Sequence, residues 1–201
     1  MKYDGTDKYC YDAHTGVLIN KFDIKDEKLL DCRIIKEQMS VIDSIKIHAP
    51  YSLNTLCYIH RKMFSCAFSW AGELRDIDIS KGNTRFCSSS YLVKEGDKIF
   101  GNVNELHHSL WFMLDDNKKT DNPDFVKKMD ELGKIICDLN MLHPFREGNG
   151  RTLRLFLELF LFNLGITITW PISSTCWMNA SINDDAKVFS SLLLDCIKTH
   201  C

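Results

Sequence analysis

The sequence predicts an all-α, mainly helical protein that carries one small β-hairpin. Apolar residues recur at helical spacing over most of the 201-residue chain, whereas only one convincing pair of strand-like segments interrupts this pattern. Two of the helical segments flank a polar loop that contains histidine, glycine and arginine. A chain of this length can bury a sizeable core, and we expect residues 1–201 to form a single domain.

Three helices are expected in the N-terminal half, after a loop-like start with turn signals in residues 1–25. The first runs from about Asp26 to Ile47 and is ended by Pro50. Ser52 is suited to cap a second helix, which extends to about Phe68, and a third covers residues 96–115. The apolar residues expected largely on one side of the first helix are Leu29, Leu30, Ile34, Ile35, Met39, Val41, Ile42 and Ile45.

Four more helices are expected after a charged connection at residues 116–121. Asn122 followed by Pro123 is a strong start signal, because asparagine caps a helix and proline suits its first position. This fourth helix ends at Leu142. The fifth begins after Gly150, is apolar almost all round and is therefore expected at the centre of the protein. The fifth helix is capped by Gly165, and two final helices cover residues 174–183 and 184–198.

The single predicted hairpin lies between the second and third helices. Residues 76–80 alternate polar and apolar side chains, residues 81–83 form a turn, and residues 84–87 can return as a second strand. Two strands are marginally stable unless they pack on something else. An exposed loop is the alternative interpretation of this segment.

The polar loop and the helix that follows it predict a polyphosphate site. Arg151, Arg154 and Glu158 follow one another at i, i+3 and i+7, so they share one face of the otherwise apolar helix. Two arginines that face inward need a counter-anion. Residues 148–150, Gly-Asn-Gly, open the helix, and their N–H groups can form an anion-binding nest.

A structural alternative is that Arg154 pairs with Glu158 and that Gly-Asn-Gly is an ordinary turn. This alternative leaves His143, Glu147 and Arg151 unexplained.

Residues 143–154 resemble the signature of the Fic (filamentation induced by cAMP) family, His-x-Phe-x-(Asp/Glu)-Gly-Asn-Gly-Arg-x-x-Arg, and every fixed position matches. Residues 9–11 and 20–22 resemble the lead-in of that family. The resemblance implies the mainly helical Fic fold and a protein adenylyltransferase (AMPylase), which transfers AMP from ATP to a tyrosine, serine or threonine hydroxyl of a target protein.

Each motif residue has an expected role in such a reaction. His143 is the general base, because its unperturbed pKa of about 6.5 suits proton transfer. Glu147 is the ligand for Mg²⁺ or Mn²⁺, and Phe145 is a core anchor. The residues expected to cradle and hold the phosphates are Gly148, Asn149, Gly150, Arg151 and Arg154.

The resemblance further implies that the hairpin, at about residues 76–91, is a flap that holds the target by strand addition. The residues expected to dock the target are Ser80, Lys81, Gly82, Asn83, Thr84, Arg85 and Phe86. Trp177 and Asn179 lie where the family forms part of the nucleotide-base wall, although a tryptophan packed in the core explains Trp177 equally well.

Many Fic proteins carry an inhibitory helix with the pattern Ser/Thr-x-x-x-Glu-(Gly/Asn), and this chain has no good match. Ser69 and Glu73 have the spacing, but Leu74 follows; Glu95 precedes a glycine, but Tyr91 stands at the serine or threonine position. By resemblance, this absence implies a stand-alone, antitoxin-regulated (class I-like) toxin. Its partner is then a small antitoxin protein that donates the helix, and type II topoisomerases such as DNA gyrase are among the implied targets.

Composition excludes several other functions. The net charge of −2 gives no case for nucleic-acid or membrane binding, and no apolar run reaches the length of a membrane span. Nine scattered cysteines without a Cys-x-x-Cys pair indicate reduced thiols in a cytoplasmic protein, with Cys32, Cys57 and Cys137 on apolar helix faces. His60 is expected to pack in the core and not to bind a metal.

Two other functions remain open. The first is a Fic enzyme with another donor, either a different nucleotide or a phosphocholine-bearing one, because the motif fixes the phosphates better than the transferred group. The second is a nucleotide-binding regulator with little transfer activity, although the intact His143 counts against it.

Overall fold

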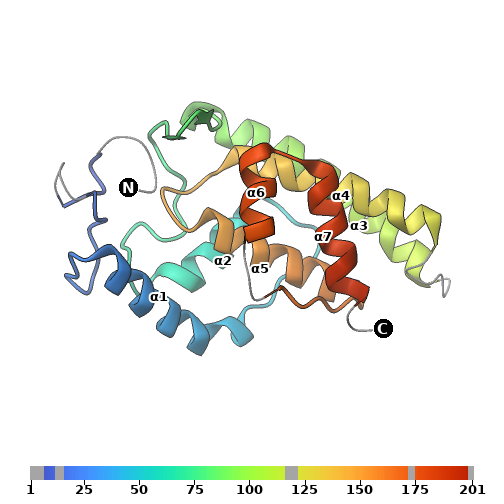
Figure 1. Cartoon of the computed structure of the whole chain (residues 1–201), viewed down its shortest axis with the longest axis horizontal. Coiled ribbons are helices and arrows are strands. Elements are labelled where there is room, and N and C mark those ends of the chain that lie inside the picture. Colours follow the sequence, from blue (N-terminus) through green and yellow to red (C-terminus); the bar gives the residue numbers. More distant parts are fainter. Residues whose placement is uncertain (1–6, 12–15, 116–121, 172–174, 199–201) are drawn as a thin grey trace.

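A computed structural model describes residues 7–11, 16–115, 122–171 and 175–198, and it confirms a mainly helical fold with one small hairpin (Figure 1). The α-helices are α1 (Glu27–Val41), α2 (Leu53–Phe64), α3 (Leu92–Asp115), α4 (Pro123–Leu142), α5 (Asn149–Phe162), α6 (Thr175–Asn183) and α7 (Ala186–Lys198). Two short 3₁₀ turns, η1 (Ile42–Ser44) and η2 (Ser89–Tyr91), and a hairpin of β1 (Ser80–Lys81) and β2 (Thr84–Arg85) complete the described elements.

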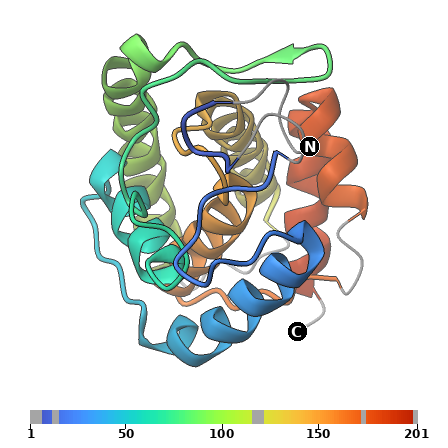
Figure 2. The same ribbon diagram turned by 90° about the vertical axis from the view of Figure 1, so that its left-hand side faces the viewer.

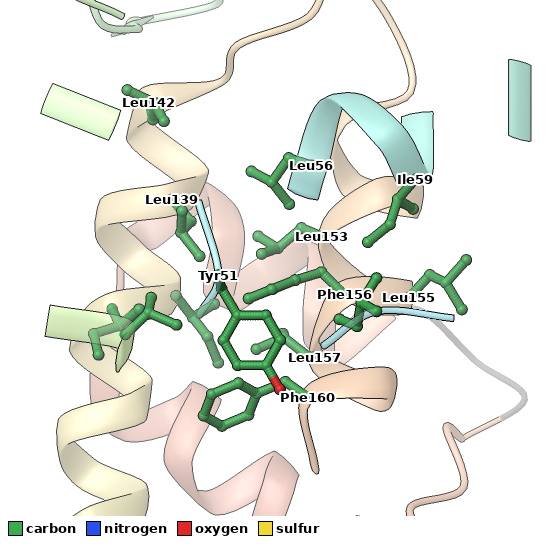
Figure 3. Close-up of a cluster of buried hydrophobic side chains, with 14 of the residues drawn as sticks. Tyr51, Leu56, Ile59, Leu139, Leu142, Leu153, Leu155, Phe156, Leu157 and Phe160 are labelled. Carbon is green, nitrogen blue, oxygen red and sulfur yellow. The ribbon is translucent and has the colours of Figure 1, made fainter. Parts of the chain in front are cut away.

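Helix α5 lies at the centre of the fold, as its apolar sequence predicts. It packs against α2 and α4, while α4 also packs against α3 and α7 (Figures 1 and 2). Leu153 of α5 meets Leu56 of α2 and Leu139 of α4 in the buried core (Figure 3). Because α5 is fixed on several sides, its N-terminus gives the motif loop a rigid support.

The ends of the helices confirm several of the expected signals. The Asn122 side chain accepts a hydrogen bond of 2.9 Å from the N–H of Asp124, and Pro123 is the first residue of α4. Ser52 and Thr55 form a capping box at the start of α2. Gly165 lies at φ 76° just beyond α5, a conformation that favours glycine.

Helix α1 is shorter than predicted and presents a different face to the core. It ends at Val41 instead of about Ile47. Its buried residues are Leu30, Ile34 and Gln38, spaced four apart. This narrow stripe is the buried face of the helix. Three of the residues expected inward are exposed, namely Leu29, Ile35 and Met39.

The hairpin is also shorter than expected, because groups that would extend its ladder bind elsewhere. Ser80 pairs with Arg85 and Lys81 with Thr84, and one further bond of 3.3 Å joins the N–H of Phe86 to the Ile79 carbonyl. Beyond it, the N–H of Cys87 donates to Met141 O of α4 at 2.9 Å. The hairpin therefore ends where its second arm joins the helical body.

The described cysteines are free thiols, and their burial differs from residue to residue. Cys137 is buried and Cys57 is half-buried, whereas Cys32 is exposed, which corrects the expectation that it faces the core. Burial and the nearby carboxylates raise the pKa of Cys137 to about 12, so its thiol stays protonated at neutral pH. Two sequence predictions lie outside the described residues: the connection at 116–121 and the start of the sixth predicted helix at Ser174.

None of the helices in the described parts of the chain is long and apolar enough to cross a bilayer.

Candidate active site

The motif loop joins α4 to α5 through two residues in the left-handed region. His143 caps the end of α4 at φ 45°, and Gly148 precedes α5 at φ 82°. A Cβ atom on Gly148 would lie 2.4 Å from Cζ of Phe64, so both the backbone angle and the available space require glycine. The backbone can therefore approach the core closely where α5 begins.

Asn149 and Phe145 fix the shape of this loop. The Asn149 side chain accepts a hydrogen bond from the N–H of Phe145 at 2.9 Å and donates one to its carbonyl at 2.7 Å. Phe145 is buried and stacks on the ring of His60, with centroids 4.0 Å apart. Phe145 is thus the core anchor that the sequence predicts, and the Asn149 side chain shapes the loop as well as flanking the expected phosphate nest.

His60 is a fully buried neutral histidine that binds the motif loop. Its Nδ1 accepts a hydrogen bond of 2.8 Å from the N–H of Gly72, so Nε2 carries the proton and donates to the Glu147 carbonyl at 2.9 Å. Burial and, to a smaller extent, the charge of Arg151 lower the pKa of His60 to about 4. The packed-histidine interpretation is confirmed, although the sequence did not reveal its bond to the motif.

His143 has the tautomer that a general base requires. Its Nδ1 donates a hydrogen bond of 2.9 Å to the Asn140 carbonyl, because a carbonyl can only accept, and the basic lone pair is therefore on Nε2. Phe86 of the hairpin stacks on the imidazole at 3.8 Å between centroids. Burial lowers the pKa of His143 to about 4, so the imidazole is unprotonated at neutral pH.

These two histidines predict a loss of stability in mild acid. Since their pKa values are lower in the folded state, the unfolded state binds more protons between pH 6.5 and 4, and stability falls as the pH drops through this window. Between pH 7 and 5 the free energy of unfolding should fall by about 2 kcal/mol for each histidine. Denaturant unfolding at both pH values measures this loss.

A pair of variants isolates the contribution of His60. His60→Gln should lose about half of the histidine-dependent change, whereas His48→Gln, at an exposed position, should keep all of it. Equal pH dependence in the two variants would show that His60 is not the acid-sensitive group.

The two motif arginines lie together at the start of α5. An Arg151 nitrogen is 3.6 Å from a carboxylate oxygen of Asp31 and 3.6 Å from one of Glu147. Arg154 forms no ion pair within the described residues. Its pKa is lowered by burial and by the nearby charge of Arg151. The alternative Arg154–Glu158 pair is not formed there; Glu158 instead accepts a hydrogen bond of 3.2 Å from Trp170 Nε1. A half-buried guanidinium beside a second cation is suited to an anionic ligand.

Glu147 fits the expected divalent cation. Its carboxylate is largely buried beside the start of α5, and the described residues contain no group of three or more His, Cys, Asp or Glu side chains that could bind a metal ion. A site with one carboxylate suits Mg²⁺ or Mn²⁺, because Mg²⁺ commonly takes one or two protein carboxylates and completes its shell with phosphate oxygens and water.

Two further buried arginines, one within the motif and one outside it, help to fix the motif loop. Arg146, within the motif, forms an ion pair of 2.6 Å with Asp7. Arg75 donates from Nε to the His143 carbonyl at 2.8 Å, and its backbone N–H donates to Pro144 O at 2.9 Å. Only their charge marks these residues in the sequence, and charge alone does not reveal burial.

The two residues of the expected base wall lie on α6. Trp177 is buried and packs edge-on against Phe189 at 4.8 Å between centroids, whereas Asn179 is exposed. Trp177 therefore packs in the core, as its alternative interpretation has it, and a role for either residue in binding the base stays a prediction.

A helical domain that brings a neutral histidine, a carboxylate and two arginines to the start of a buried helix has the layout of a nucleotide-dependent transferase. Residues 50–161, more than half of the chain, match the Fic/DOC family. The chain belongs to this family, and the resemblance of its motif is confirmed.

Curated relatives agree with the predicted enzyme class. The "Probable protein adenylyltransferase Fic" of Salmonella typhimurium (strain LT2) is 33% identical over 63% of this chain and 58% of its own length. The protein of the same name from Escherichia coli (strain K12) is 27% identical over 89% of this chain and 84% of its own length. These names are those of nucleotidyltransferases that act on proteins.

Solved structures share the fold. The Fic domain of a Bartonella effector protein from Bartonella sp. AR 15-3 has a TM-score of 0.77 and 22% identity, covering 98% of this chain and 94% of that one. BepC from Bartonella tribocorum, solved with bound AMPPNP, has a TM-score of 0.77 and 21% identity, covering 96% and 97%.

Proposed function

We propose that this protein is a protein adenylyltransferase, which transfers AMP from ATP to a tyrosine, serine or threonine hydroxyl of a target protein and releases pyrophosphate. The observation that carries the proposal is that one motif contains a neutral His143, basic at Nε2, and two neighbouring arginines in the first half of α5. The names of the relatives from Salmonella and E. coli support the same reaction.

In the proposed reaction His143 Nε2 takes the proton of the target hydroxyl as its oxygen attacks the α-phosphorus. The bond from the α-phosphorus to the bridging oxygen breaks, and pyrophosphate leaves. Arg151 and Arg154 hold the departing negative charge, and the N–H groups of Gly148, Asn149 and Gly150 cradle the phosphates. Catalysis of this kind depends mainly on positioning and charge stabilisation, which a rigid loop provides.

Glu147 would hold the Mg²⁺ or Mn²⁺ ion, which when bound neutralises phosphate charge. The flap residues Ser80–Phe86 would pair with an extended segment of the target and present its hydroxyl to His143. With two residues in each strand, the flap itself offers a short edge, so the side chains around it must add to target recognition.

Incubation with ATP labelled at the α-phosphate and a bacterial lysate tests the proposal, followed by mass spectrometry of the labelled proteins. A mass increase matching AMP on a hydroxyl side chain is expected. Label that appears only with another nucleotide or a phosphocholine donor would favour the alternative donors. ATP binding without any transfer would favour the regulator.

The regulation of the enzyme is a further prediction. No inhibitory pattern occurs in the sequence, so the isolated protein should modify itself and be toxic in the cytoplasm of a bacterium that contains its target, such as a type II topoisomerase. A small antitoxin with a Ser/Thr-x-x-x-Glu-(Gly/Asn) helix should suppress both effects by placing its glutamate against Arg154. Growth after induction and auto-modification with labelled ATP measure this prediction.

A matched variant separates an internal inhibitor from an external one. Asp31 of α1 is an internal carboxylate outside the motif that faces Arg151, at 3.6 Å. If the wild-type protein is silent and Asp31→Asn activates it, the inhibition is internal and the idea of a separate partner is wrong. Auto-modification by both proteins at the same rate agrees with an external antitoxin.

A further inference from the structure

The hairpin residue Phe86 touches the expected base instead of pointing toward solvent. Its side chain is 8% exposed, and its ring stacks on the imidazole of His143 with centroids 3.8 Å apart and planes 18° from parallel. A flat contact of this kind restricts the plane of the histidine ring. A residue expected to dock the target thus lies against the group that performs the proton transfer.

The other sides of His143 are fixed as well. Nδ1 binds the Asn140 carbonyl at 2.9 Å, which restricts the edge of the ring that lies away from Nε2. The backbone adopts φ 45°, and its carbonyl accepts the 2.8 Å bond from Arg75 Nε. The stack on Phe86 is a contact that the hairpin makes with the ring.

Arg75 holds both arms of the hairpin in place. Its guanidinium donates to the carbonyl of Ile77, before β1, at 2.7 Å and to the carbonyl of Cys87, after β2. The same group binds the carbonyl of His143. Because a guanidinium is planar and rigid, it fixes the base of the hairpin relative to the motif loop and so sets where Phe86 lies.

We infer that Phe86 is a positioning residue, which the hairpin and Arg75 hold against His143 so that Nε2 points toward the reacting hydroxyl. This inference rests on the proposed function, because it concerns proton transfer by that base. It makes the hairpin a part of the base's support as well as a docking edge. Movement of the hairpin would then change the orientation of the base.

The surroundings of the imidazole give the inference a second readout. Burial is the main cause of the low pKa of His143, and the charged groups that lower it further are Arg75 of the hairpin base and Lys81 of β1. Phe86 covers one face of the ring, so its removal would admit water. The pKa of His143 should then rise from about 4 toward 6.5.

Substitutions at Phe86 test this inference, with Ile79→Ala as the matched control. Ile79 is the other buried member of the same small apolar cluster, so both alanine variants remove packing there, but only Phe86→Ala removes the ring that stacks on His143. Phe86→Leu keeps apolar bulk, and Phe86→Tyr keeps a flat aromatic face. NMR titration of the His143 ring and the pH profile of AMP transfer to lysate proteins are measured for all four.

We expect Phe86→Ala to raise the His143 pKa by more than one unit and to lower kcat about 10- to 100-fold, with the KM for ATP changed less than about twofold. Phe86→Tyr should restore most of the rate, and Phe86→Leu should not. Ile79→Ala should keep the wild-type pKa even if it lowers stability. Identical titration and identical transfer in the two alanine variants would overturn the inference. The NMR titration needs no ATP or target, so a wild-type protein without transfer activity would count against the proposed function alone.

Discussion

His143→Ala should lower the rate of AMP transfer by about 10²–10⁴-fold, the typical effect of losing a general base, while ATP binds nearly as well as before. In the proposed mechanism the imidazole acts on the incoming hydroxyl, whereas Arg151, Arg154 and the start of α5 bind the phosphates. The variant loses the ring contacts with Asn140 and Phe86, but the backbone of residue 143 still caps α4 and still offers its carbonyl to Arg75.

Calorimetric titration with a non-hydrolysable ATP analogue and the transfer assay measure the two effects separately. His108→Ala is a suitable control, because His108 is an exposed histidine on α3 and lies outside the motif. A rate for His143→Ala within a few-fold of the wild-type rate would remove His143 from its assigned role. Loss of ATP binding together with the rate would mean that the ring supports the nucleotide site.

The wild-type pH profile follows from the same geometry. Because the pKa of His143 is lowered to about 4, the base stays unprotonated well below the range of an ordinary histidine. As long as the protein remains folded, the transfer rate should therefore begin to fall only below pH 5.

The sequence predicted the features that are decided by residues close to one another along the chain. Helix α4 starts and ends where Asn122, Pro123 and Leu142 indicated, since capping and proline effects act within a few residues. The motif residues follow one another in one continuous stretch of sequence, so the family could also be identified from the sequence. The family match confirms that identification.

The support of the motif loop depends on contacts between distant parts of the chain, which a single sequence does not reveal. His60 binds Glu147 across 87 residues, and Arg75 binds His143 across 68. A histidine on an apolar helix face and an arginine after a turn are common in sequences, and nothing local shows which carbonyls they meet. The support of the motif loop therefore became visible only in three dimensions.

The errors in α1 and in the hairpin have the same origin. Leu29 and Met39 have helical spacing, but spacing alone does not say how wide a stripe the neighbouring elements cover. The alternation of residues 76–80 predicted a longer strand, yet Arg75 takes the carbonyl of Ile77 and Met141 takes the N–H of Cys87. In both cases a tertiary contact decided what the local pattern left open.

Glu147→Gln should lower the transfer rate by at least about a hundredfold at physiological Mg²⁺, because metal coordination at phosphates contributes several kcal/mol to transition-state stabilisation. The substitution keeps the size of the side chain and removes its charge. It also leaves the bond from His60 intact, since that bond goes to the Glu147 backbone carbonyl. The fold of the loop should therefore survive.

Transfer rates measured against Mg²⁺ or Mn²⁺ concentration show whether the loss is one of metal binding. If Glu147 holds the cation, Glu147→Gln should need a much higher metal concentration for half-maximal rate, whereas Glu105→Gln, at an exposed position on α3, should match the wild type. A wild-type rate that a chelator leaves unchanged would exclude the metal role. Since Glu147 also faces Arg151 at 3.6 Å, a loss of rate without any change in metal dependence would instead assign the carboxylate to placing that arginine.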